Sequence, residues 1–279
     1  MAQVQIVYAA TAEGLVQLAD PGATGRWRIV DRALEGTDVV AVCASPVDPL
    51  HAAAATADAI YETTDGGAGW ERVYEGAVAG LAATNDAIYA GTPGGAILRH
   101  GATESWSQVH QGSAALVRLG SLHADRLAAI YADGTIEVLT GAIWRPLDAH
   151  TSDPTNIVSS VTEPDTYYVV DATGLTTATG HVAVGEGPTG ALVLLPGKTE
   201  VLLCGTSGAL QRSDDGGANF APVEPTDVRV LVSPPRYQDQ VYAGTGAGDL
   251  WFSRDRGRTW AVLRGGLAAV RDLSFARVI

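Results

Sequence analysis

Short apolar runs separated by turn residues recur along the whole chain. Several runs lead into residues typical of turns, such as Ser45–Pro49, and the 33 glycines and 13 prolines are spread along the length. This pattern predicts an all-β protein with many tight turns. Seven of these runs are expected to be the same strand in seven copies of a repeating unit. They are Val39–Val42, Val78–Leu81, Leu116–Leu119, Ile157–Ser160, Ala191–Leu194, Val228–Leu231 and Val270–Leu273.

Aromatic residues mark the same repeat independently. Successive members are 36 to 43 residues apart, with one gap of 76, in the series Trp27, Trp70, Trp106, Trp144, Phe220 and Trp260. The double gap indicates a degenerate unit near His181–Val184, which makes seven units. Four short strands in about 40 residues are typical of a propeller blade, whose first strand lines a central channel. The sequence therefore predicts an all-β, seven-bladed β-propeller of four-stranded antiparallel blades.

The two ends of the chain supply complementary strands. The chain opens with a second strand, Val4–Ala10, and closes with an unpaired first strand, Val270–Ile279. We expect the C-terminal strand to complete the N-terminal blade and close the ring, which removes exposed sheet edges. No stretch has the composition of a linker, so residues 1–279 are expected to form a single β-propeller domain.

Three segments fit the pattern Ser/Thr-x-Asp-x-Gly-x-x-aromatic. In a hairpin turn, the Asp carboxylate accepts bonds from backbone N–H groups, and Gly supplies backbone angles that other residues resist. The aromatic side chain then packs between sheets and buries about 150–250 Å². The matching positions are Thr63, Asp65, Gly67 and Trp70; Ser213, Asp215, Gly217 and Phe220; and Ser253, Asp255, Gly257 and Trp260.

These segments resemble the Asp-box, or BNR, repeats of a β-propeller superfamily. That superfamily includes sialidases, xyloglucan-degrading glycosidases, sortilin-type receptors and photosystem assembly factors. The resemblance covers the whole chain through its period, although three blades carry the full motif. It implies that Asp65, Asp215 and Asp255 lie on peripheral turns and are structural. The motif therefore specifies the fold and leaves the activity open.

Sialidases of this superfamily carry a Phe/Tyr-Arg-Ile-Pro motif near the N-terminus, together with an arginine triad and a Tyr–Glu nucleophile pair. The nearest string here, Trp27–Val30, lacks the proline and follows a blade anchor. The loops are also too short to wall a sugar pocket. Sialidase activity is therefore not expected.

Charge and cysteine content narrow the function further. The formal charge is −13, from 31 acidic and 18 basic residues, which disfavours nucleic acid and anionic membranes as partners. Met1–Tyr8 lacks the character of a signal peptide, and no stretch approaches the roughly 20 apolar residues of a membrane span. Cys43 and Cys204 lie in apolar runs, so we expect buried free thiols and a cytoplasmic location.

Two predicted connections between blades hold candidate binding residues. They span residues 31–38 and 147–156 and should lie on one face of the disc, where propeller loops normally carry function. The alternative is an ordinary solvated connection. The candidates on these connections are Arg32, Glu35, Asp38, His150 and Asp153.

Arginines also recur on the predicted first strands. Arg229 and Arg271 occupy the same repeat position, and Arg118 is displaced by one place. Near a channel mouth they could bind a carboxylate or an acidic partner. Alternatively, each pairs with a neighbouring acid such as Asp227 or Asp272 and has a structural role.

No catalytic or cofactor-binding set emerges. The six histidines and two cysteines lack metal-ligand spacing, and Gly244–Gly248 joins two strands rather than opening a helix. A lyase would need clustered His and acid residues at the channel mouth, which the pattern does not show. We therefore expect no metal or cofactor, and a non-enzymatic scaffold that presents a rigid disc to a protein partner.

The scarcity of lysine, with Lys198 alone, beside many Ala, Gly and Arg residues is typical of a GC-rich bacterial genome. The expected setting is therefore a bacterial multiprotein assembly. The alternative function is a glycan-active propeller, either a glycoside hydrolase or a lectin, which rests on the family resemblance and on acidic loop residues such as Asp38 and Asp153.

Overall fold

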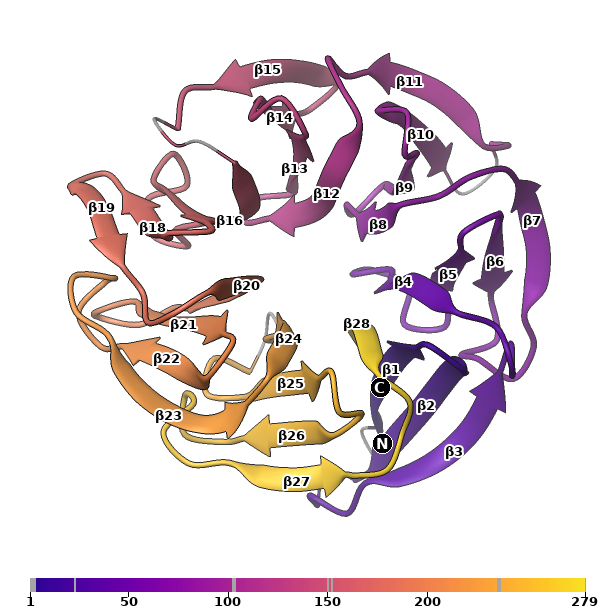
Figure 1. Ribbon diagram of the computed structural model, residues 1–279. Helices are drawn as coiled ribbons and strands as arrows, with labels where there is room; N and C mark the ends of the chain where they lie inside the picture. Colours follow the sequence, from indigo (N-terminus) through magenta and orange to yellow (C-terminus); the bar gives the residue numbers. More distant parts are fainter. Residues whose placement is uncertain are drawn as a thin grey trace.

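The computed structural model describes residues 4–22, 24–101, 104–149, 151, 153–234 and 237–278. These residues form seven four-stranded antiparallel sheets, and no helix occurs among them. The sheets stand around a common axis as the blades of a ring (Figure 1). The predicted all-β, seven-bladed propeller is confirmed.

Each blade runs from an inner strand at the axis to an outer strand at the rim. Blades 1 and 2 consist of β28 (Val270–Val278), β1 (Val4–Thr11), β2 (Gly14–Pro21) and β3 (Arg28–Ala33), and of β4 (Val39–Ala44), β5 (Ala52–Thr56), β6 (Ala59–Thr63) and β7 (Glu71–Glu75). Blades 3 and 4 consist of β8 (Gly80–Ala83), β9 (Ala87–Gly91), β10 (Ala96–Gly101) and β11 (Ser107–Gln111), and of β12 (Leu116–Leu122), β13 (Arg126–Tyr131), β14 (Ile136–Thr140) and β15 (Ile143–Leu147).

The remaining three blades follow the same order from axis to rim. Blade 5 consists of β16 (Pro154–Ser159), β17 (Tyr167–Asp171), β18 (Gly174–Thr177) and β19 (Gly180–Ala183). Blades 6 and 7 consist of β20 (Pro188–Leu195), β21 (Val201–Thr206), β22 (Ala209–Ser213) and β23 (Ala221–Thr226), and of β24 (Val228–Val232), β25 (Val241–Thr245), β26 (Leu250–Ser253) and β27 (Ala261–Arg264). The degenerate unit predicted near His181 is the outer strand of blade 5.

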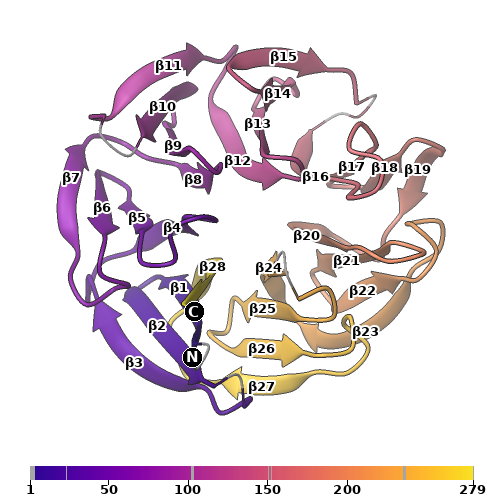
Figure 2. The ribbon, with the colours of Figure 1, turned by 180° about the vertical axis from the view of Figure 1, so that it is seen from behind.

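Antiparallel order gives the disc two distinct faces (Figures 1 and 2). We call one the connection face, because the chain passes there from each outer strand to the next inner strand. The turns between the second and third strands of each blade lie on it too. The opposite face, which we call the turn face, carries the other two kinds of turn. A bond from Gly66 N–H to the Leu50 carbonyl, 2.9 Å long, joins two such turns on the turn face.

The last strand closes the ring. β28 pairs antiparallel with β1 from Val4↔Val278 to Thr11↔Val270, so both chain ends lie in blade 1 (Figure 1). Side chains of β28 also reach the inner strand of blade 2: Ser274 Oγ accepts a bond of 2.9 Å from Ala44 N–H. The predicted closure by the C-terminal strand is confirmed. It satisfies backbone groups that an open sheet would leave unpaired.

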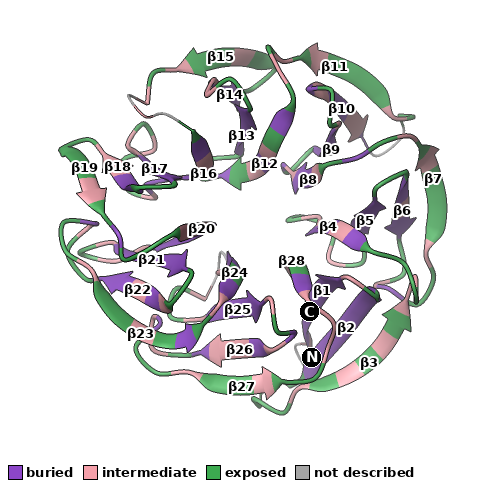
Figure 3. Cartoon of the chain, in the orientation of Figure 1, coloured by how far each residue is buried: buried purple, intermediate pink, exposed green. Residues whose placement is uncertain are grey.

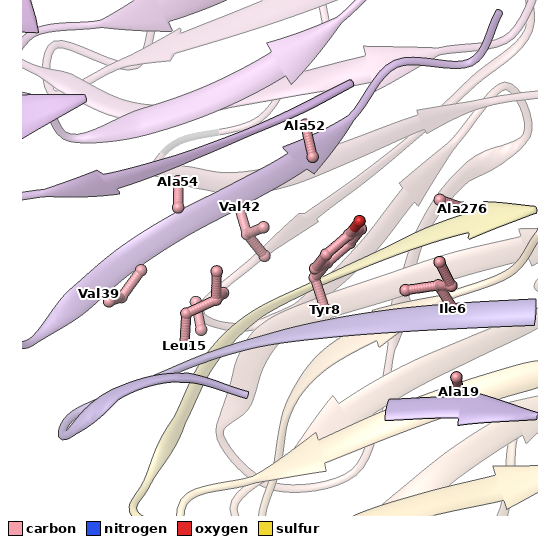
Figure 4. Close-up of a cluster of buried hydrophobic side chains, with 10 residues drawn as sticks. Ile6, Tyr8, Leu15, Ala19, Val39, Val42, Ala52, Ala54 and Ala276 are labelled. Carbon is pink, nitrogen blue, oxygen red and sulfur yellow. The ribbon is translucent and has the colours of Figure 1, made fainter. Parts of the chain in front are cut away.

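The hydrophobic core lies between the blades. Inner and middle strands are mostly buried, whereas outer strands such as β7 and β11 are mostly exposed (Figure 3). Between blades 1 and 2, Tyr8 is fully buried with Leu15 and Val42 (Figure 4). Trp70 meets the Tyr8 ring edge-on, with ring centroids 6.0 Å apart. Cys43 and Cys204 are buried free thiols, as predicted.

The three Ser/Thr-x-Asp turns have one common hydrogen-bond pattern. In each turn the first hydroxyl donates to the Asp and accepts from the Gly N–H two residues beyond the Asp; for Ser213 these distances are 2.7 and 2.8 Å. Asp215 also accepts from Asn219 N–H at 2.9 Å. The glycines have left-handed φ angles of 100°, 92° and 78° at Gly67, Gly217 and Gly257. The geometry agrees with the hairpin-turn interpretation.

A related turn in blade 1 was not recognised in the sequence. Between β2 and β3, Asp20 accepts bonds from Thr24, Gly25 and Arg26 N–H at 3.0, 2.6 and 3.2 Å. Asp20 is buried, and Gly22 keeps the glycine position of the motif, but Leu18 stands in place of the Ser/Thr and the aromatic Trp27 comes two residues late. One carboxylate therefore organises the turn without the full motif.

The Asp215 turn should make stability depend on pH in acid. Hydrogen bonds from the Asn219 side chain and backbone lower the Asp215 pKa from 3.8 to about 2. A lowered folded-state pKa gives a stabilisation that is present above the ordinary pKa of 3.8 and is lost as the pH falls toward 2. Asp215→Asn should therefore melt below the unmodified protein at pH 6, and this difference should shrink by pH 2.5. Thermal melts across that range test it; a difference that does not change with pH would contradict it.

Candidate functional site

The candidate site begins at the inner strands, where β-bulges set the side-chain positions. In six of the seven blades the pairing register shifts near the start of the inner strand. A bulge adds one residue and re-aims its side chain. Arg229 and Arg271 are the extra residues in β24 and β28, and Arg118 follows the extra residue in β12. The displacement of Arg118 by one place relative to Arg229 and Arg271 is therefore also present in the structure, where Arg118 follows the bulge instead of forming it.

Two of these arginines form ion pairs on the connection face. Arg229 Nη2 lies 2.6 Å from Asp227 Oδ1, as the structural alternative expected. The expectation that Arg271 pairs with Asp272 is wrong: Arg271 Nε and Nη2 donate instead to Asp38, at 3.1 and 3.3 Å. All four side chains are about one-third to one-half exposed, so each pair stabilises by only about 0–1 kcal/mol.

Arg118 and Asp272 occupy equivalent positions on the inner strands of two blades. Their strands, β12 and β28, belong to blades 4 and 1, which are not neighbours (Figure 1). Both residues directly follow the bulge, so they lie at the same height, and the two charges interact. Burial raises the pKa of Asp272 to about 6 against the opposing effects of the Val42 N–H and of Arg118. Burial also lowers the pKa of Arg118.

Arg32 and Glu35 line a hollow beside the closing blade. The hollow has a volume of about 450 Å³ and lies where blade 1 meets the connection from blade 7. Glu13, in the turn between β1 and β2, contributes a second carboxylate. The Gly36 N–H donates to the Glu13 carbonyl at 3.1 Å and ties the two loops together. This site was not expected as a unit, because Glu13 comes from a different loop than Arg32 and Glu35.

The second predicted connection is shorter than expected. β16 begins at Pro154, since Pro154 and Asn156 already pair with Asp171 and Val170. Asp153 is exposed and has a left-handed φ of 55°. His150 lies outside the described residues.

Histidines meet carboxylates at two blade interfaces that the sequence did not indicate. Glu62 of blade 2 lies 3.4 Å from His51 Nε2 and 2.9 Å from Nδ1 of His100 in blade 3. The hydrogen bond to Glu62 is the main cause of a raised His51 pKa. His110 of blade 3 lies 2.6 Å from Glu137 of blade 4. Among the described residues, no group of three or more His, Cys, Asp or Glu is arranged to hold a metal ion.

Charge is distributed unevenly around the ring. Residues 229–279, which make up nearly all of blade 7 and the closing strand, contain eight arginines and four aspartates. Residues 1–228 contain ten basic and 27 acidic residues. We call the part formed by residues 229–279 the basic sector. It has a net charge of +4 in a protein whose total charge is −13.

The fold is similar to several solved structures. A chain in the crystal structure of the mitotic checkpoint complex is 16% identical, with a TM-score of 0.67 over 89% of this chain and 83% of that chain. YCF48 from Cyanidioschyzon merolae is 15% identical, with a TM-score of 0.59 over 80% of this chain and 84% of that chain. The chain in a structure of YCF48 bound to D1 peptide is 16% identical, with a TM-score of 0.57 over 89% of this chain and 85% of that chain.

These likenesses establish the fold alone. Each identity is below one residue in five, and one propeller fold supports many unrelated functions. No protein-family model and no curated protein sequence matches the chain. Within the part of the chain that the structure describes, there is no helix long and apolar enough to cross a membrane. The features that bear on function are therefore the charged surface and the inner strands around the axis of the ring.

Proposed function

We propose that the protein is a non-enzymatic Asp-box propeller that docks an acidic protein partner on its basic sector, as a scaffold subunit of a bacterial assembly. The observation that carries this proposal is the net charge of +4 on residues 229–279 against −17 on the rest of the chain. Arginine is enriched in protein interfaces, and complementary charge accelerates encounter and selects the partner.

Several side chains of the basic sector are free to receive such a partner. Arg254 and Arg264 are exposed and have no carboxylate partner among the described residues. Arg254 instead lies 5.2 Å over the Phe252 ring, and Arg277 lies 5.5 Å over the Tyr237 ring. Guanidinium groups that rest on aromatic rings keep their donors available for carboxylates.

Proteins of the same fold engage protein partners, which supports the proposal without identifying a partner. One solved structure shows YCF48 bound to D1 peptide, and another chain belongs to the mitotic checkpoint complex.

Within the proposed function, the docking surface lies on the connection face and contains Arg264, at the end of β27, with the ion-paired Arg229 and Arg271 beside it; Arg254, in the turn between β26 and β27, and Arg277, at the far end of β28, lie toward the turn face. Arg32 lies on that face as an additional contact; the carboxylates of Glu35, Asp38 and Asp153 lie there too and limit the docking surface, because they repel an acidic partner.

Matched charge reversals test the proposal. Arg264→Glu on β27 changes the basic sector, and Arg145→Glu makes the same change on β15, the corresponding outer strand of blade 4. In quantitative affinity capture from the native host, a partner should be retained by the unmodified protein and by Arg145→Glu. It should be lost from Arg264→Glu and released by raised salt. A partner held equally by both variants would place docking elsewhere.

The glycan-active alternative keeps one supporting observation. The hollow of about 450 Å³ presents Glu13, Glu35 and Arg32 together, and glycoside hydrolysis uses two carboxyl groups across a cleft. A glycan array combined with fluorogenic glycosides tests it. Hydrolysis lost in Glu35→Gln or in Asp153→Asn would favour the glycan-active function over the scaffold.

A further inference from the structure

Blade 3 is the one blade, among the described residues, with a histidine–glutamate contact at each of its two interfaces. Toward blade 2, Nδ1 of His100 on β10 lies 2.9 Å from Oε1 of Glu62 on β6. Toward blade 4, Nε2 of His110 on β11 lies 2.6 Å from Oε2 of Glu137 on β14. Because blade 3 lies between these two blades (Figure 1), the contacts hold it from both sides.

Each contact is arranged to favour a protonated histidine. The His100 ring stacks on Trp106 with ring centroids 5.2 Å apart, and the His110 ring stacks on Trp144 at 5.0 Å. The face of an indole attracts a cation, and the glutamate supplies the opposite charge. The exposed fraction of the four paired side chains is at most 21%, so solvent screens these charges only weakly.

The contact between Glu62 and His100 shows the need for a proton most directly. Oε1 of Glu62 and Nδ1 of His100 are both covered by protein, and neither atom forms a hydrogen bond. Two bare acceptors at 2.9 Å would repel each other, whereas an imidazolium compensates the buried carboxylate. The other oxygen of Glu62 lies 3.4 Å from Nε2 of His51, and this hydrogen bond is the main cause of the raised His51 pKa.

The other titratable groups around the two contacts are either acidic or neutral. They are Asp48, Glu71 and Cys43 near Glu62, and Tyr131 and Asp133 near Glu137. Burial raises the pKa of the Cys43 thiol and of the Tyr131 phenol, so both stay neutral near pH 7. Within the described part of the chain, no arginine or lysine pairs with either glutamate. The surroundings therefore add to the attraction for a histidine cation.

Blade 3 also has fewer local supports than its neighbours. Its inner strand β8 has four residues, against six in β4 and seven in β12. The pairing of β8 with β9 has no bulge, and blade 3 lacks a full Ser/Thr-x-Asp turn. The histidine contacts therefore make up a larger share of what holds this blade in place.

We propose that blade 3 is a pH-responsive segment of the ring, held tightly to blades 2 and 4 while His100 and His110 are protonated and loosened when they lose their protons. A histidine whose cation gains a carboxylate on folding stabilises the fold below its ordinary pKa of about 6.5, and this stabilisation is lost as the pH rises through the folded-state value. The raised pKa of His51 has the same direction. These contacts lie outside the basic sector, so the proposal does not depend on the docking function.

Hydrogen exchange at about pH 5.5 and about pH 8.5 tests the proposal, with rates expressed as protection factors so that the intrinsic pH dependence of exchange is removed. Blade 6 contains no histidine and is the internal reference. At the higher pH, protection of β8–β11 should fall about tenfold more than protection of β20–β23, because charge-assisted contacts are lost at both interfaces. A parallel change in the two blades would overturn the proposal.

Variants separate the effect of the proton from general packing. His100→Gln/His110→Gln should make blades 3 and 6 respond alike to pH. His123→Gln is the matched control, because His123 is exposed in the β12–β13 turn and its ring has no carboxylate partner among the described residues; this variant should keep the tenfold difference. If the double histidine variant does not fold, Glu62→Gln/Glu137→Gln keeps the side-chain shape, removes the charge and should have the same effect. A blade 3 response that survives in either double variant would overturn the proposal.

Discussion

A chain that ends before β28 should not form a cooperative folded ring. The strand pairs with β1 along its whole length and buries Val270, Leu273 and Ala276 between neighbouring blades. Each large apolar side chain contributes about 1.5–3 kcal/mol, and each strand hydrogen bond about 1 kcal/mol. Their sum is comparable with the ~5–15 kcal/mol that stabilises an entire domain. Circular dichroism melts and sedimentation should show aggregation or a loss of the sharp transition.

Complementation provides the control for this truncation. A synthetic peptide with the sequence of residues 270–279 should restore a cooperative transition, because it can occupy the vacant inner position of blade 1. A scrambled peptide of the same composition should not restore it. A truncated chain that remains monomeric and melts within a few degrees of the full chain would show that closure adds little.

Tyr8→Ala should give the largest loss of stability from a single substitution described here. The ring is fully buried between blades 1 and 2 and meets Trp70 edge-on. Truncation of a large buried aromatic residue leaves a cavity and costs about 3–5 kcal/mol. Urea denaturation should show a lower midpoint for this variant.

Tyr8→Phe is the matched control for the same site. The Tyr8 hydroxyl is buried without a hydrogen-bond partner, so its removal should be neutral or stabilising, within about 1 kcal/mol. Two variants that destabilise equally would indicate an unseen partner for the hydroxyl rather than a packing role for the ring.

The sequence specified the fold well because its main signals are local. The turns at Asp65, Asp215 and Asp255 depend on contacts within a few residues, and the aromatic spacing repeats them at the scale of a blade. Even the degenerate blade 5 could be placed by counting, and its outer strand β19 lies where the double gap predicted. The hairpin turns and the repeat length can therefore be predicted from the sequence without knowledge of long-range contacts.

The candidate site was less predictable because its contacts join distant parts of the chain. Asp38 and Arg271 are 233 positions apart, and nothing in either local sequence favours that pair over Arg271 with Asp272. The choice follows from the bulge, which turns Arg271 toward the connection face and Asp272 toward Val42. The hollow at Arg32 and the contacts around Glu62 likewise depend on how neighbouring blades abut.

The shared sheet of the two chain ends has a consequence for biosynthesis. β1 emerges from the ribosome first, yet its inner-side partner β28 is made after every other strand. At about 5–20 residues per second, the nascent chain carries β1 with one unpaired edge for roughly 13–50 s. During translation the growing polypeptide is therefore an open arc whose β1 edge has unpaired backbone N–H and C=O groups. Protection of this edge by a chaperone would matter most in that interval.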